Sequence, residues 1–134
     1  MNVTVIAIGD ELLIGQVTDT NSGWISRNLN PYGWNVKSVK VIGDDSTAIY
    51  KAIDEAFAES DIVLTTGGSG PTKDDITKAT LCGYFGGELV LDDATLLNVE
   101  QVLEKRHLSM NELNHSQAMV PTSCRVIQNA VGTA

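Results

Sequence analysis

Three strand-like runs that alternate with helical patterns constrain the fold of this chain more than any other feature. Val3–Ile8 is nearly continuous in apolar and β-branched residues, which is typical of a central parallel strand buried on both faces. Val36–Ile42 and Asp61–Thr66 predict two further strands, and a helical pattern separates each strand from the next. This alternation favours β-α-β units, so the sequence predicts an α/β domain with a doubly wound, mostly parallel sheet.

Helical periodicity and capping residues place the other elements. Asp45 or Ser46 is expected to cap a helix whose inward residues follow the i, i+3, i+4, i+7, i+8 spacing, namely Ile49, Ala52, Ile53, Ala56 and Phe57. On an earlier helix, Trp24, Ile25 and Leu29 are expected to face inward. The remaining predictions, in chain order, are a loop at 12–15, a helix at Thr77–Tyr84, a strand at Glu88–Leu91, a helix capped by Asp93, a helix at Asn111–Met119 and a strand at Arg125–Ile127.

Length and charge bound the domain count and the class of partner. The 134 residues, of which 43% are hydrophobic, fit one domain (1–134) with a single hydrophobic core. Nine basic and 17 acidic residues give a net charge of −8, which leaves no chain-wide basic surface for nucleic acid or an anionic membrane. The expected partners are therefore small molecules, cations or copies of the chain itself.

The start of the chain predicts a cytoplasmic protein. Met1-Asn2 leads directly into the first strand-like run, without the basic and apolar regions of a signal peptide, and no apolar segment approaches membrane-spanning length. Cys82 and Cys124 lack the spacing of a zinc site and are interpreted as reduced thiols.

A glycine-rich loop, Gly67-Gly68-Ser69-Gly70, follows the third predicted strand. Glycine accepts positive φ, and outward N–H groups beside a helix N-terminus bind anions such as phosphate. The loop is therefore a candidate phosphate cradle, although it matches neither the P-loop nor the Rossmann spacing. The alternative is a tight β-to-α turn that needs glycine only for its geometry.

Acidic pairs follow all three predicted strands, at Asp10-Glu11, Asp44-Asp45 and Asp74-Asp75. Because ligands of doubly wound sheets bind at the carboxyl ends of the strands, we expect these acids at one edge of the sheet. Acids beside a phosphate cradle repel the ligand unless a metal bridges the two, so the pattern predicts a divalent cation such as Mg²⁺. The alternatives are a solvated turn at the first pair and helix capping by the other two.

A polar stripe marks one of the later helices. Asn111, Asn114 and Gln117 recur every three residues, which fits either a solvated face or amide contacts to a ligand or a neighbouring subunit. His107 and His115 lack an acid or a cysteine at metal-ligand spacing and are expected at the surface or boundary.

Six motifs occur in a familiar order along the whole chain. They are Ile8–Gln16, Thr20–Ser22, Gly43-Asp44, Thr66–Thr77, Asn114 with Gln117 and Pro121, and Asn129–Ala134. Together they resemble the N-terminal domain of the competence/damage-inducible protein (CinA) family, in the molybdopterin-binding, or molybdenum cofactor biosynthesis, superfamily. The resemblance implies a three-layer α/β/α, molybdopterin-binding-domain-like fold that self-associates as a dimer or trimer.

The resemblance also implies an activity, a metal-dependent ADP-ribose pyrophosphatase that yields AMP and ribose 5-phosphate. In the wider superfamily, the catalytic aspartate of molybdopterin adenylyltransferases falls on Asp75 and a strand-end aspartate falls on Asp44. The Gly-Asp-Glu-Leu sequence of the molybdenum-insertion branch falls on Gly9–Leu12. Asp10 stands where the CinA family usually has threonine and Ser69 where it has leucine, so both positions lean toward the molybdopterin branches.

Full-length CinA proteins carry a C-terminal nicotinamide-nucleotide amidase domain, and their N-terminal domain continues past the Gly-Thr-Ala segment. The resemblance thus implies a single domain that is truncated at its C-terminal end, without the amidase activity.

Three functions are consistent with these residues. The leading hypothesis is the pyrophosphatase. The second is a molybdopterin-binding adenylyltransferase, because both reactions handle a pyrophosphate bridge, and the third is a non-catalytic nucleotide-binding module.

Three kinds of role are assigned to the residues. The catalytic residues are Asp75, Asp44 and Asp74. The phosphate- or nucleotide-binding residues are Gly67, Gly68, Ser69, Gly70, Thr72, Thr77 and Asn21, and the ligands of Mg²⁺ or a similar divalent metal ion are Asp10, Glu11, Asp44 and Asp75.

Overall fold

Strand β1 (Asn2–Ile8) is the centre of a three-stranded parallel sheet. It pairs with β2 (Asn35–Ile42) on one side and with β3 (Ile62–Gly67) on the other, in the order β2-β1-β3. All residues of β1 from Val3 to Ile8 are buried. The three predicted parallel strands and the burial of the first on both faces are therefore confirmed.

The computed structural model describes residues 1–68 and 75–133, apart from the side chains of Asp75 and Leu113. The chain consists of two compact units, unit 1 (Met1–Gly68) and unit 2 (Ser69–Ala134). Unit 1 contains the parallel sheet, and unit 2 contains an antiparallel pair of strands.

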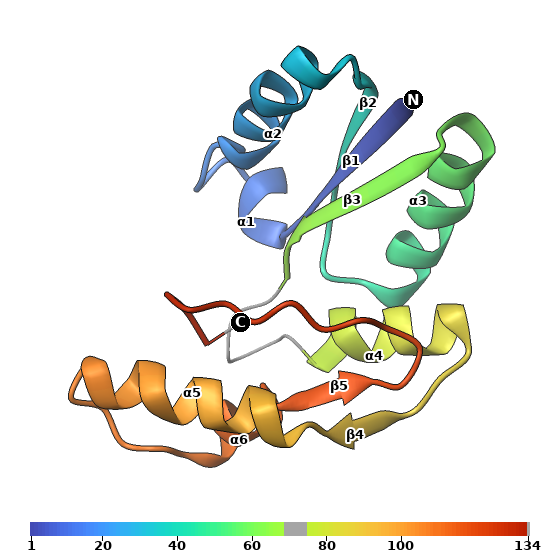
Figure 1. Cartoon of the computed structure of the whole chain (residues 1–134). Coiled ribbons are helices and arrows are strands. Elements are labelled where there is room, and N and C mark those ends of the chain that lie inside the picture. Colours follow the sequence, from blue (N-terminus) through green and yellow to red (C-terminus); the bar gives the residue numbers. More distant parts are fainter. Residues whose placement is uncertain (69–74, 134) are drawn as a thin grey trace. The chain divides into compact units, whose positions relative to one another are not determined.

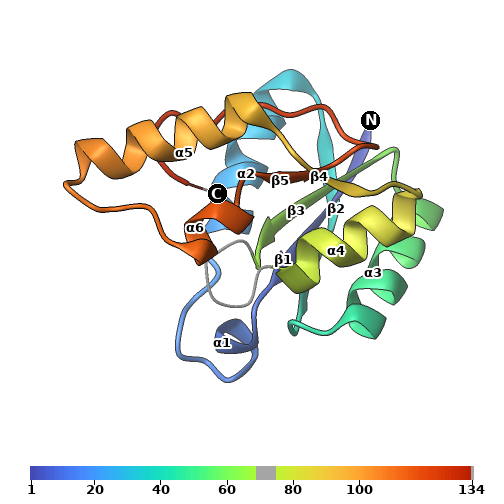
Figure 2. The same cartoon turned by 90° about the horizontal axis from the view of Figure 1, so that it is seen from below.

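Helices cover both faces of the sheet in unit 1. Figures 1 and 2 show α2 (Asn21–Leu29) on one face and α3 (Ser46–Glu59) on the other, which gives three layers. The Asp45 side chain accepts a hydrogen bond from the Ala48 N–H at 2.8 Å and so caps α3, as the sequence predicts. Four of the five predicted inward residues of α3 are buried, whereas Phe57 is 45% exposed.

The N-terminal segments of unit 1 differ from the prediction in two places. Residues 12–15 are not all loop, because a short helix, α1 (Asp10–Leu13), begins directly after β1. Trp24 does not face inward and is 62% exposed. The other two predicted inward residues, Ile25 and Leu29, are half-buried, and Ser22 is the buried residue of α2.

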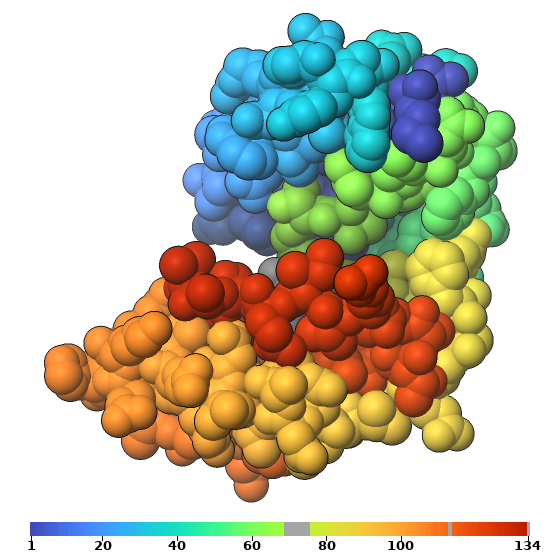
Figure 3. All heavy atoms as spheres, viewed as in Figure 1, coloured from blue at the N-terminus to red at the C-terminus, as the bar shows by residue number. Residues whose placement is uncertain are grey.

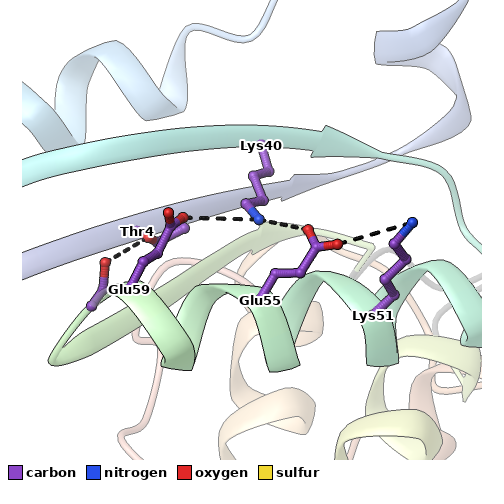
Figure 4. Close-up of polar contacts among 6 residues, drawn as sticks. Thr4, Lys40, Lys51, Glu55 and Glu59 are labelled. Atoms are coloured by element: carbon purple, nitrogen blue, oxygen red, sulfur yellow. Dashed lines mark hydrogen bonds and ion pairs between the residues drawn. The ribbon is translucent and has the colours of Figure 1, made fainter.

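An ion-pair network joins β2 to α3 (Figure 4). The Lys40 Nζ lies 2.8 Å from Glu55 Oε2 and 3.9 Å from Glu59 Oε1, and Lys51 lies 3.9 Å from Glu55. Next to this network, the hydroxyl of Thr4, buried in β1, forms a 2.7 Å hydrogen bond with Ser60. The hydrogen bond from Lys40 and its charge hold the pKa of the Glu55 carboxyl below its ordinary value of 4.5.

Unit 2 is built around a short antiparallel pair, β4 (Leu89–Leu91) with β5 (Met119–Pro121). Its helices are α4 (Asp75–Phe85), α5 (Asp93–Lys105) and α6 (Glu112–Ser116). The cap of α5 is Asp92, one residue before the predicted Asp93, and its side chain accepts a hydrogen bond from the Thr95 N–H at 2.9 Å. Val99, Val102 and Leu103 of α5 are buried in the core.

The last predicted helix and the last predicted strand are both corrected. The helix predicted at Asn111–Met119 is shorter, because Met119 already belongs to β5. The strand predicted at Arg125–Ile127 does not form, and Ile127 is 89% exposed. The pairing with β4 ends where the Thr122 N–H donates to the Glu88 carbonyl, after which the chain turns away.

The segment 122–133 instead lies along α5 without regular structure. Asn98 donates to the Asn129 carbonyl at 2.7 Å, Arg106 donates to the Val131 carbonyl at 2.7 Å, and Gln128 donates to the Thr95 hydroxyl at 3.0 Å. Figure 3 shows this segment, in red, against the orange surface of α5. Side-chain hydrogen bonds thus hold this segment against α5, although the sequence of residues 125–127 within it resembles a strand.

We predict that Gly67→Ala destabilises the chain far more than Gly15→Ala. Both glycines have positive φ, at 82° and 77°, but a Cβ on Gly67 would overlap the Ile8 carbonyl, whereas nothing lies within 4 Å of a Cβ on Gly15. The free energy of unfolding in urea should fall by about 2 kcal/mol more for Gly67→Ala. Equal losses for the two variants would contradict the close approach of β3 to β1.

We also predict that the contribution of Glu55 to stability disappears in acid. Because its folded pKa is lowered, the stabilisation is present above about pH 4.5 and is lost as the pH falls through the folded pKa. At pH 7 the Tm of the parent chain should therefore be higher than that of the Glu55→Gln variant, and this difference in Tm should vanish near pH 3. Glu100→Gln, at an exposed position on α5, is the matched control and should show no such pH dependence. A difference in Tm that persists near pH 3 would rule out this explanation.

Candidate functional site

The carboxyl ends of the three parallel strands lie level with one another. Ile8, the last residue of β1, is in register with Ile42 of β2 and with Gly67 of β3. The residues that follow each strand therefore emerge at the same edge of the sheet. β1 lies between the second and the third strand, so this edge includes the switch point at which ligands of doubly wound sheets bind.

Asp10 and Asp44 are brought together at this edge, 34 residues apart in sequence. The Asp44 N–H donates to Asp10 Oδ1 at 3.1 Å, and the Asp10 N–H donates to Asp44 Oδ2 at 3.4 Å. Each aspartate thus holds the backbone of the other turn. Among the described residues these bonds use one oxygen of each carboxylate, and the second oxygen remains a donor atom for a cation.

Gly43 allows this close approach. A Cβ at Gly43 would stand 2.7 Å from Asp10 Oδ1 and 3.4 Å from a methyl group of Leu13. Any larger residue would push the Asp10 carboxylate away from the turn that it caps. The pairing of the two aspartates therefore requires a glycine directly before Asp44.

The first residue of α2 contacts the end of β3. Asn21 Nδ2 donates to Thr66 Oγ1 at 3.1 Å, so the predicted site residue Asn21 lies beside the strand that leads into the glycine loop. The Ser22 N–H is bound by Asp19 Oδ1 at 3.0 Å, which fixes this helix start. Thr66 was not predicted as a site residue. Its position directly before the two glycines is the sequence feature that could have identified it.

The glycine turn itself is described as far as Gly68. Gly67 and Gly68 have φ of 82° and 63°, and the Gly67 backbone passes close to the Ile8 carbonyl. This geometry explains both glycines without a ligand and does not test the predicted phosphate contacts. Four predicted site residues, Ser69, Gly70, Thr72 and Asp74, lie outside the described residues.

The predicted metal ligands are placed in part. Asp10 is exposed, while Glu11 and Asp44 are half-buried. Asp75 is the first residue of α4, and its side chain lies outside the described part. Within residues 1–68 and 75–133, no group of three or more His, Cys, Asp or Glu is arranged to hold a metal ion. The pair Asp10 and Asp44 nevertheless fits the preference of Mg²⁺ for one or two carboxylates with water or phosphate oxygens as further ligands.

Thr77, predicted to bind phosphate, lies in the first turns of α4 and is 8% exposed. Its hydroxyl has no hydrogen-bond partner among the described residues. In the same unit, Gln117 is also 8% exposed, and its Nε2 has no partner in the described part of the chain either. The sequence placed Gln117 on a polar stripe, and the structure shows that this end of the stripe is buried rather than solvated.

The parallel sheet of unit 1 carries an acidic pair and a glycine turn at the edge where its strands end. These features are typical of the class of doubly wound α/β domains that bind ligands at the carboxyl ends of their strands. The chain belongs to the family described as "Probable molybdopterin binding domain", whose sequence model matches residues 4–132, and within it to the CinA proteins. The predicted family and fold class are thereby confirmed.

Three similar proteins illustrate this membership. A CinA-like protein of Cytophaga hutchinsonii is 48% identical over 97% of this chain and 31% of its own length. The crystal structure of CinA from Thermoplasma acidophilum is similar over 100% of this chain and 79% of that one, with 34% identity and a TM-score of 0.87. The tungsten cofactor synthesizing protein MoaB of Pyrococcus furiosus has a TM-score of 0.60 and 24% identity over 90% of this chain and 78% of that one, which shows the shared fold alone.

The chain spans about a third of the length of the curated relatives that it matches, with coverage of 31% for the first. No helix in the described residues is long and apolar enough to cross a membrane.

We predict that Mg²⁺ stabilises the chain through Asp10 and Asp44. Two carboxylates held in neighbouring turns repel one another, and a divalent cation between them offsets this repulsion. The Tm of the parent chain should rise by a few degrees in about 10 mM Mg²⁺, whereas that of Asp44→Asn should not. Asp93→Asn, an exposed aspartate of α5, is the matched control and should respond like the parent. An undiminished response of Asp44→Asn would exclude this pair as the cation site.

Proposed function

We propose that this chain binds a phosphate-bearing pterin of the molybdopterin type at the carboxyl edge of its parallel sheet. The observation that carries the proposal is the reciprocal pairing of Asp10 and Asp44 at the level ends of β1 and β2. The family to which the chain belongs supports the pterin as the ligand.

The edge suits an anionic ligand for two physical reasons. A divalent cation on the Asp10 and Asp44 carboxylates offers positive charge to phosphate oxygens, which the bare acids would repel. The turn after β3 has positive φ at Gly67 and Gly68, and loops of this kind expose backbone N–H groups. Asn21, held against Thr66, adds an amide beside the same strand end.

A second candidate function is hydrolysis of ADP-ribose to AMP and ribose 5-phosphate. This activity is the one that the resemblance to the CinA family implies, and the chain belongs to that family. Both functions use an edge that holds a phosphate or pyrophosphate group. The hydrolase would need the metal to orient water, with Asp44, Asp74 or Asp75 as ligand or general base. The adenylyltransferase reaction would use the same acids to transfer the nucleotidyl group of a nucleoside triphosphate to the pterin phosphate, with pyrophosphate as the leaving group.

Self-association as a dimer or trimer and a cytoplasmic location belong to the same proposal. The self-association follows from the family resemblance.

The test compares ligands on the full chain by titration calorimetry with Mg²⁺ present. We expect hydroxymethylpterin diphosphate to bind the parent chain and to bind Asp44→Asn at least about tenfold more weakly, because the bridging cation is lost. Asp93→Asn should bind like the parent. The proposal is wrong if the folded parent chain does not bind the pterin probe, whatever its stability.

Chromatography of the same chain with ADP-ribose and Mg²⁺ separates the two functions. AMP that forms with the parent and not with Asp75→Ala would establish the hydrolase. Binding of the pterin probe without AMP formation would favour the molybdopterin-type protein.

A further inference from the structure

Two buried polar groups of unit 2 have no partner among the residues that the structure describes. Thr77 and Gln117 are each 8% exposed, and neither the Thr77 hydroxyl nor the Gln117 Nε2 forms a hydrogen bond within residues 1–68 and 75–133. Burial without a partner removes water from a polar group and gives nothing in return, so such groups are rare in native proteins. Ser22 Oγ in unit 1 is a further atom of this kind, so a ligand is inferred from where Thr77 and Gln117 lie and not from the missing hydrogen bonds alone.

The two groups belong to neighbouring segments. The Lys78 Nζ lies 3.3 Å from the Gln117 carbonyl and 3.5 Å from the Ser116 carbonyl, so the start of α4 adjoins the end of α6. The side chain of Lys78 is engaged with backbone oxygens at this junction.

The orientation of the Gln117 amide is fixed from within the chain. Asn114 Nδ2 donates to Gln117 Oε1 at 3.4 Å, and Asn111 holds the Asn114 N–H at 2.8 Å in the cap of α6. The acceptor side of the amide is therefore used, and the two N–H groups of Nε2 remain. A partner for Nε2 must supply a hydrogen-bond acceptor.

We propose that Gln117, assisted by Thr77, binds a ring carbonyl or ring nitrogen of a fused heterocycle such as a pterin or a purine. An amide and a hydroxyl are neutral, and neutral donors suit a ring acceptor better than a phosphate, which charged or backbone donors bind more strongly. A buried donor also discriminates strongly against rings that lack the acceptor. The inference rests on the proposed function for the class of ligand but not for the residues that contact it.

The experiment measures binding to Gln117→Met and Thr77→Val in the full chain. The probes are hydroxymethylpterin diphosphate, AMP and inorganic pyrophosphate, which has no ring. We expect Gln117→Met to bind at least one ring-bearing probe about tenfold more weakly than the parent and to bind pyrophosphate equally well. Its Tm without ligand should be unchanged or higher, because an unsatisfied buried group is removed. Gln101→Met, at an exposed position on α5, is the matched control.

Thr77→Val gives an independent measurement at the second group. If both side chains contact the same ring, the double variant should lose less affinity than the sum of the two single losses.

Each other outcome overturns the inference. If Gln117→Met binds both ring-bearing probes as well as the parent does and has a lower Tm, the Gln117 amide stabilises the ligand-free chain and does not bind a ring. If the parent binds pyrophosphate but neither ring-bearing probe, the ring subsite is wrong while anion binding stands. If the parent binds none of the three, the subsite and the proposed function are both wrong.

Discussion

The pairing of β1 with a parallel strand on each side is the constraint on which unit 1 depends. Val3 to Ile8 are buried completely or nearly so, and each large aliphatic side chain among them contributes about 2 kcal/mol by leaving water. A strand buried in this way cannot slip by one residue, because every side chain would change faces. The register that brings Ile8 level with Ile42 and Gly67 is therefore fixed by the core, and the positions of Asp10 and Asp44 follow from it.

The turns at the sheet edge show how much of the site is already explained by structure. Asp10 and Asp44 bind each other's backbone N–H groups, and Gly43 leaves room for the Asp10 carboxylate. These contacts would stabilise two βα turns even if no ligand ever bound. A cation would therefore bind through the second oxygen of each carboxylate and the negative charge of the pair, neither of which the turn geometry requires.

Sequence patterns predicted the elements whose burial follows local periodicity, and they failed where distant contacts decide. The strands at 3–8, 36–42 and 61–66 and the cap at Asp45 are correct because apolar runs and capping residues act locally. On α2, Ile25 and Leu29 are half-buried as expected, but Trp24 is exposed and Ser22 is buried. Arg125–Ile127 has a strand-like composition, yet β4 takes Met119–Pro121 as its partner, and hydrogen bonds to α5 hold the later segment. The acidic strand ends were predicted from the topology, whereas the burial of Gln117 was not, because a stripe at helical spacing does not reveal which of its ends meets α4.

Gln117 and the acidic pair are different kinds of evidence for a ligand. Asp10 is exposed, and water can satisfy whatever the protein does not, so its position alone costs the fold little. Gln117 is buried at the junction of α6 with α4, and its Nε2 has no hydrogen-bond partner in the described part of the chain, which destabilises the ligand-free chain. A leucine or methionine at this position would fill the same space without that loss. A buried amide held by Asn114 is therefore the feature of unit 2 that the proposed ring acceptor would explain and that packing alone does not.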